Sequence, residues 1–121
     1  MLLELLRVKV QELIVTESVE SYPGSIGLPQ EIIDAAGLKK FELVHVNNKT
    51  NGSRILTYVV PSKDRGLVTV NGAASKHFNA GDHIHVLSFA YVKRKEADTH
   101  VPRIVYTDEQ NFVKEVKDYI F

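Results

Sequence analysis

Leu67-Val68-Thr69-Val70-Asn71-Gly72, followed by Gly81-Asp82 and His83-Ile84-His85-Val86-Leu87-Ser88-Phe89-Ala90, alternates apolar runs with turn residues. Short β-branched runs bounded by Gly, Asn and Asp are typical of strands joined by tight turns. The same character recurs in Leu6–Val10, Leu13–Thr16, Phe41–Val46 and Ile55–Val60, with Asn51-Gly52 as a hairpin turn between the last two. Several short strands spaced in this way predict a mainly β chain forming a barrel, with Gly81-Asp82 as the turn before its last strand.

Two helices are predicted beside these strands. Pro29 suits a first helical turn, and Gly37 is well placed to end the short internal helix that Glu31–Ala36 continues. Near the end of the chain, Thr107-Asp108-Glu109-Gln110 has the form of a capping box. The apolar residues after it follow helical spacing and predict an amphipathic C-terminal helix: Phe112, Val113, Val116, Tyr119 and Ile120.

Composition limits the possible partners and location of the protein. The 121 residues, 44% of them hydrophobic, predict a single domain over 1–121 with one modest core. Fifteen basic and fifteen acidic residues balance, which argues against nucleic-acid and anionic-membrane partners. Cysteine is absent, and the apolar start of the chain is interrupted by Glu4, so neither a disulfide scaffold nor a signal peptide is indicated. A cytoplasmic location is expected.

Tyr22-Pro23-Gly24-Ser25-Ile26 permits chemistry beyond an ordinary turn. Pro-Gly favours a type II turn, and that interpretation fits almost any surface loop. A Ser25 hydroxyl held against the Gly24 carbonyl could also attack it, moving the acyl group from nitrogen to oxygen. The ester could then break by β-elimination, leaving a chain that ends at Gly24 and a dehydroalanine at position 25. Loss of the dehydroalanine nitrogen to water would leave a pyruvoyl group at the start of residues 25–121.

Many small motifs in one order resemble the pyruvoyl-dependent aspartate 1-decarboxylase family, over nearly the whole chain. They are Lys9, Val15-Thr16, Tyr22, Gly24-Ser25-Ile26, Asp34-Ala35-Ala36-Gly37, Asn51-Gly52, Arg54, Thr57-Tyr58, Val70-Asn71-Gly72-Ala73-Ala74, Gly81-Asp82 and Ser88-Phe89. The resemblance implies a double-psi β-barrel, cleaved by itself into a β chain (1–24) and an α chain (25–121). It implies decarboxylation of L-aspartate to β-alanine and CO2, in the supply of pantothenate and coenzyme A. It also implies a homotetramer with sites between subunits, and it leaves open whether a maturation factor assists cleavage.

The resemblance also gives roles to individual residues. Ser25 is the precursor of the pyruvoyl group, which forms a Schiff base with the substrate amine and acts as the electron sink. Tyr58 is the proton donor, and Thr57 polarises the Gly24 carbonyl during cleavage and contacts substrate. The other expected substrate-binding residues are Lys9, Arg54, Asn71, Gly72, Ala73 and Ala74. No glycine loop of the kind that holds pyridoxal phosphate accompanies them, and no metal is expected.

Other interpretations remain open for several of these residues. An isolated Lys or Arg is usually a solvated charge, Tyr58 could be a packed strand aromatic, and Asn71-Gly72 is locally typical of a tight turn. His83 and His85 could share one strand face and bind a metal, together with His45, His77 or His100.

The chain also departs from the family pattern at two positions. Gln11 and Glu12 replace a His and an Arg that members commonly carry. The departure keeps a second function open, in which an unprocessed, non-catalytic barrel binds a small molecule or acts as a regulator.

Overall fold

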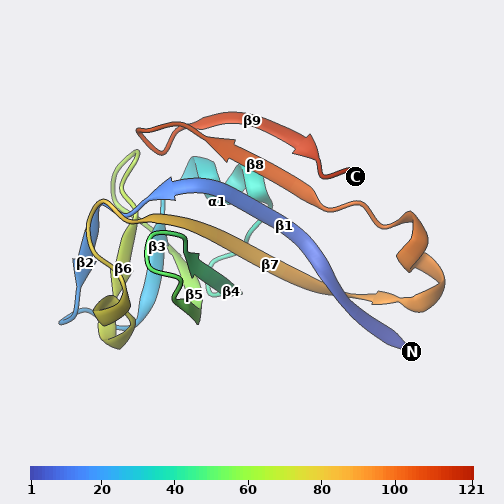
Figure 1. The fold of residues 1–121 in the computed structure, drawn as a ribbon, viewed down its shortest axis with the longest axis horizontal. Helices are drawn as coiled ribbons and strands as arrows, with labels where there is room; N and C mark the ends of the chain where they lie inside the picture. The colour runs from blue at the N-terminus through green and yellow to red at the C-terminus, as the bar shows by residue number, and fades with distance from the viewer.

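The computed structural model describes residues 1–121 and is built mostly of β-strands (Figure 1). The nine strands are β1 (Leu2–Ile14), β2 (Glu17–Val19), β3 (Ser25–Leu28), β4 (Leu43–Asn48), β5 (Arg54–Pro61), β6 (Thr69–Asn71), β7 (His83–Lys93), β8 (Arg103–Thr107) and β9 (Val113–Asp118). One α-helix, α1 (Gln30–Ala36), and two 3₁₀ helices, η1 (Gly72–His77) and η2 (Arg94–Thr99), complete the chain. The predicted mainly β class is confirmed.

All nine strands belong to one mixed sheet in the order β2-β6-β3-β5-β4-β7-β1-β8-β9. Three pairs are parallel, namely β1 with β8, β2 with β6 and β3 with β5, and the others are antiparallel. The longest pair, β1 with β7, forms the curved arch that crosses Figure 1. This mixed sheet with few helices agrees with the expected double-psi β-barrel.

The core follows the two-residue period of the strands. Along β1, Val8 and Val10 are buried while Lys9 between them is partly exposed, and Ile84 and Val86 on β7 repeat the pattern around His85. These side chains join one cluster of 19 buried residues that also includes Val44, Val46 and Val59. One face of β1, β4, β5 and β7 therefore packs inward, and the alternate residues face outward.

The short internal helix lies where the sequence predicts it. α1 starts after Pro29 and ends at Gly37, whose left-handed conformation (φ 67°) lets its N–H reach the Asp34 carbonyl. Ile32, Ile33 and Ala36 are buried against the sheet. None of the helices has the length and apolar content needed to cross a bilayer.

The predicted C-terminal helix is wrong, and Gly81-Asp82 is not the turn before the last strand. β8 and β9 follow β7 and form an antiparallel hairpin from Arg103↔Asp118 to Thr107↔Val113. Asp108 accepts hydrogen bonds at Oδ1 from the N–H groups of Gln110 and Phe112, which makes a tight turn in place of a helix start. Asp and Asn side chains often compete with helical backbone bonds in this way. The apolar residues after the turn instead supply a strand that pairs with β8.

Candidate active site

Ser25 begins β3 and is almost fully buried, at 5% exposure. Its backbone pairs with Asn71 on β6, and Asn71 Nδ2 donates to Ser25 Oγ over 3.0 Å. The same Nδ2 lies 3.4 Å from Thr69 Oγ1, and Ser25 Oγ donates to the Pro23 carbonyl over 3.4 Å. The hydroxyl that the sequence singles out is therefore held beside the Gly24–Ser25 bond by an adjacent strand.

Asn71 carries an unused acceptor at this position. Its Oδ1 is buried and has no hydrogen-bond partner in the protein. A buried polar atom without a partner costs about 1–3 kcal/mol, so such atoms often mark places where a ligand group completes the bonding. A cavity of about 370 Å³ lies against Asn71, and Tyr22, Gly27 and Thr69 also line it.

Gly72 and Gly24 touch through their backbones. A Cβ on Gly72 would lie 2.6 Å from Gly24 Cα and 2.8 Å from Gly24 N, and Gly72 has a φ of 76°. Only glycine fits both the conformation and the approach. Asn71-Gly72 does not form the tight turn of which its local sequence is typical, because Gly72 is the first residue of η1, which continues with Ala73 and Ala74. Gly24, Asn71 and Gly72 therefore lie together beside Ser25, and Ala73 and Ala74 follow Gly72 in η1.

Thr57 and Tyr58 lie on the other neighbour of β3. β3 and β5 are parallel, and Ile26 pairs with Val59. Ser25 and Tyr58 therefore occupy equivalent positions on the two strands, each one residue before this pair. Tyr58 is partly exposed, with its ring centroid 6.2 Å from that of Phe41, while Thr57 projects to the opposite face of β5. Together with Leu43 and Leu56, these residues line an open apolar hollow of about 620 Å³. Ser25 therefore lies between the strands that carry Asn71 and Tyr58.

Lys9 and Arg54 are not brought to Ser25 within one chain. Arg54 lies five residues before Val59, which is about 16 Å along β5. Lys9 is on β1, four strands away from β3 in the sheet order.

The two cations nevertheless share the outward face of the sheet. Arg54 pairs with Asn47, Asn47 pairs with His85, and Lys9 pairs with Leu87, two residues along from His85. Arg54 Nε donates to Asn47 Oδ1 over 2.6 Å. No ion pair in the structure involves Lys9 or Arg54.

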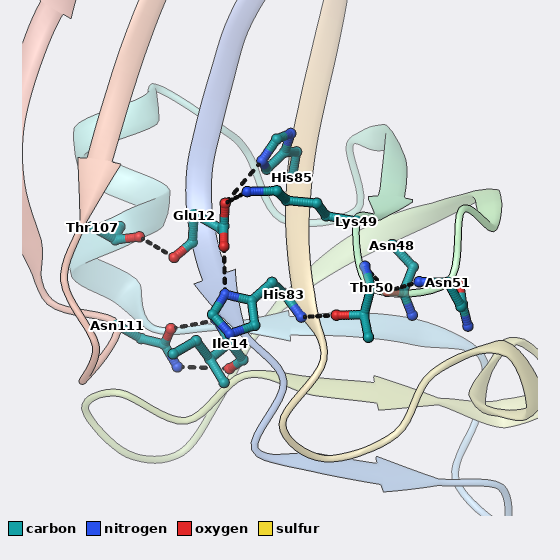
Figure 2. A network of polar contacts seen from close by, with 10 residues as sticks. All are labelled: Glu12, Ile14, Asn48, Lys49, Thr50, Asn51, His83, His85, Thr107 and Asn111. Carbon is teal, nitrogen blue, oxygen red and sulfur yellow. Dashed lines mark hydrogen bonds and ion pairs between the residues drawn. The ribbon is translucent and has the colours of Figure 1, made fainter.

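A polar network around Glu12 lies on the same face and was not predicted from the sequence (Figure 2). The Glu12 carboxylate pairs with Lys49 Nζ at 2.9 Å, with His83 Nδ1 in close contact, and with His85 Nε2 at 3.6 Å. The hydrogen bond from Lys49, followed by those from the two imidazoles, lowers the pKa of Glu12 despite some burial. Burial and the nearby Lys9 charge lower the pKa of His85. The departure from the family pattern at Glu12 is the sequence signal that could have pointed to this network.

The two histidines of this network do share a strand face, as the metal interpretation required. Both rings, however, contact the same carboxylate, and no group of three His, Asp or Glu side chains has an arrangement that could hold a metal ion. Two of the other histidines have contacts elsewhere. His100 Nε2 contacts the Leu6 carbonyl at 2.6 Å, and the His45 ring packs edge-on against Phe89.

The sequence of this chain is similar to those of known proteins over nearly its whole length. A sequence model of the family described as aspartate decarboxylase matches residues 1–114. Among similar proteins, an aspartate 1-decarboxylase from Clostridium botulinum is 37% identical over 100% of this chain and 98% of its own length. Those from Leptothrix cholodnii and Bordetella avium are 37% and 34% identical, over 93% and 95% of this chain and 87% and 95% of their own. The chain belongs to the aspartate decarboxylase family.

Proposed function

We propose that this protein is an aspartate 1-decarboxylase, a carboxy-lyase that converts L-aspartate to β-alanine and CO2 in the cytoplasm. β-Alanine then supplies pantothenate and coenzyme A synthesis. The observation that carries the proposal is the buried Ser25 hydroxyl, fixed by Asn71 beside a Gly24 that packs on Gly72. An ordinary surface turn needs none of these contacts.

The proposed cofactor is a pyruvoyl group made from Ser25. Ser25 Oγ attacks the Gly24 carbonyl, and β-elimination from the resulting ester separates 1–24 from a chain that begins with dehydroalanine at position 25. Water then replaces the dehydroalanine nitrogen, which leaves as ammonia, and the pyruvoyl group remains at the start of 25–121. Thr57 on β5 is proposed to polarise the Gly24 carbonyl. The surroundings fit the group, because Asn71 offers both a donor at Nδ2 and a free acceptor at Oδ1. When formed, the group supplies the electron sink for loss of the α-carboxylate.

The remaining steps belong to side chains of the protein. A guanidinium and an ammonium bind the substrate carboxylates well, and Arg54 and Lys9 are the two cations proposed for this task. The Tyr58 phenol is proposed to donate a proton to the α-carbon after CO2 has left, since its strand lies next to β3. The Gly72, Ala73 and Ala74 backbone is proposed to approach the substrate closely, because small side chains leave it uncovered.

Sites formed between copies of the chain resolve the separation of Ser25 from Lys9 and Arg54. The outward face that carries both cations also exposes Phe41, Leu43 and Leu56, which are 64%, 60% and 58% accessible. An apolar area of this kind typically marks an interface. In the proposed homotetramer, the cations of one subunit complete the Ser25 site of another.

Intact-mass analysis of the denatured protein tests the cofactor. We expect two fragments divided after Gly24, with a pyruvoyl group in place of Ser25 on the larger one, and release of β-alanine from L-aspartate. Ser25→Ala should remain one chain and have no turnover. Normal turnover by that variant would overturn the proposal. A wild-type chain that is cleaved only after addition of cell extract would show that a maturation factor is needed.

Subunit mixing tests the shared site. Ser25→Ala and Arg54→Ala chains should each be inactive alone. Co-expressed in one cell, they should regain part of the wild-type activity, because some sites then combine an intact Ser25 with an intact Arg54 from another chain. Activity that stays absent in purified hybrid tetramers would place both residues of a site in one subunit.

A further inference from the structure

The Glu12 carboxylate is engaged from two different elements of the chain. Lys49 approaches it from the turn after β4, while His83 and His85 approach it from β7 (Figure 2). The Glu12 carbonyl is fixed as well, because Thr107 Oγ1 donates to it over 2.9 Å. Backbone and side chain are therefore both tied, in a residue whose side chain is only 29% exposed.

His85 contacts this carboxylate and also lies near the residues that carry or neighbour the two cations proposed to bind substrate. Asn47, the neighbour of His85 in the sheet, hydrogen-bonds to Arg54. Lys9 is diagonal to His85 across the β1–β7 pair, a relation in which side chains about 7–8 Å apart still interact. The Lys9 charge is close enough to influence the imidazole.

A free carboxylate at this position would oppose binding of an anionic substrate. It could swing toward Lys9 or Arg54 and pair with them, or repel a dicarboxylate held by them, since unit charges several ångströms apart interact appreciably at a protein surface. The structure shows the reverse, because Glu12 has three partners and neither Lys9 nor Arg54 is in any ion pair.

We propose that Lys49, His83 and His85 hold the Glu12 carboxylate away from Lys9 and Arg54, so that this network sets the affinity of the site for its dicarboxylate substrate. Glu12 and Lys49 are then positioning residues that act through the two cations and do not touch substrate. The inference rests on the proposed function, in which Lys9 and Arg54 bind the carboxylates of aspartate.

Lys49→Met releases the carboxylate and gives the direct test. We expect its KM for L-aspartate to rise about threefold with kcat unchanged, in line with the modest strength of exposed ion pairs. Glu12→Gln should lower KM or leave it unchanged, because the opposing charge is gone. The double variant Glu12→Gln/Lys49→Met should match Glu12→Gln. If Lys49 acted only on the stability of the fold, adding Glu12→Gln would not lower the raised KM.

Arg65→Met is the matched control. The Arg65–Glu31 pair has side-chain exposures of 67% and 31%, against 61% and 29% for Lys49–Glu12, and is made by other elements. Its KM should equal that of the wild type. An unchanged KM in Lys49→Met, or a raised KM that persists in the double variant, would overturn the inference.

Succinate binding by the same variants separates this inference from the proposed function. Succinate is a dicarboxylate without an amine, so it reports occupation of the cations without turnover. We expect its dissociation constant to follow the order of the KM values. If the dissociation constants of the variants for succinate follow this expected order, and the cleaved wild type does not decarboxylate aspartate, the proposed function fails and the charge arrangement stands. If binding is the same in the wild type, Lys49→Met, Glu12→Gln and the double variant, the charge arrangement fails.

Discussion

Ser25 is kept in place by residues whose size matters as much as their chemistry. Asn71 supplies the hydrogen bond, while Gly72 supplies the space in which the Gly24 backbone lies. The two effects can be separated, because another glycine of the chain has a similar backbone conformation and no neighbours. Gly52 has a φ of 82°, and a Cβ added there would meet nothing within 4 Å, whereas Gly72 faces Gly24.

Gly72→Ala should therefore cost more than Gly52→Ala. Both substitutions place alanine in the left-handed region, at about 1–2 kcal/mol of unfolding free energy. Only Gly72→Ala also pushes against Gly24, and we expect a further loss of about 1–3 kcal/mol together with slower chain cleavage. Urea unfolding and the time course of cleavage measure the two effects. Equal losses in both variants would contradict the close packing of Gly72 on Gly24.

Tyr58→Phe separates cleavage from turnover. The ring can keep its packing against Phe41, and only the hydroxyl is lost. Cleavage at Gly24–Ser25 should proceed normally, while kcat should fall by about 10²-fold or more if the phenol donates the proton. Tyr91→Phe, at a 71% exposed tyrosine on β7, is the control and should keep full activity. If Tyr58→Phe kept the wild-type kcat, a group other than Tyr58 would have to donate the proton.

The β8–β9 hairpin shows why an element can be mistaken when its pattern is read locally. Thr107-Asp108-Glu109-Gln110 satisfies the sequence rule for a helix start, yet Asp108 uses the same oxygen to close a turn. What decides the outcome is Asn111, whose side chain reaches segments far away in the sequence. A local pattern carries no information about those partners.

Asn111 should consequently be a stabilising residue of this hairpin. It is buried with a φ of 63°, accepts at Oδ1 from the Ile14 N–H, and donates at Nδ2 to the Ile14 and Gly66 carbonyls (Figure 2 shows the contact with Ile14). Asn111→Ala should lower the unfolding free energy by about 3 kcal/mol, from three lost hydrogen bonds. Glycine adopts the positive φ of this position more easily than alanine does. A smaller loss of unfolding free energy in Asn111→Gly than in Asn111→Ala would therefore measure the cost of the backbone conformation. Wild-type stability in both variants would contradict this role.

Sequence reasoning succeeded for the mainly β fold, and it was incomplete for the cationic face. The strands and the Asn51-Gly52 turn follow from local pattern, and the family resemblance grouped Gly24, Ser25, Asn71 and Gly72, which the structure brings together. Lys9 and Arg54 lie apart from Ser25 because the order of strands in the sheet decides which strands are neighbours. No local sequence pattern reveals that order. Glu12 and His85 are 73 positions apart, and only the register of β1 on β7 makes them partners.

Acid should destabilise the folded protein, because all three groups with a perturbed pKa act in the same direction. The pKa of Glu12 is lowered mainly by Lys49, and that of Glu42 is lowered because hydrogen bonds from Ser88, Arg7 and Lys39 outweigh its burial. Burial lowers the pKa of His85 below its usual 6.5. In each case the unfolded chain binds protons more readily than the folded one, so unfolding free energy falls as pH falls.

The window differs between the histidine and the carboxylates, which makes the His85 part measurable. Its contribution is complete above the unfolded pKa near 6.5 and is lost as pH falls through the lower folded pKa, whereas Glu12 and Glu42 act only below 4.5. Lys9 and Lys49 face His85 as cations and Glu12 faces it as an anion, so the imidazole senses all three. His85→Gln should therefore flatten the pH dependence of unfolding in the interval just below about pH 6.5 and leave the loss below about pH 4.5 in place. Urea unfolding of both proteins at one fixed concentration checks this, and parallel curves over the upper interval would show that His85 titrates alike in the folded and unfolded chain.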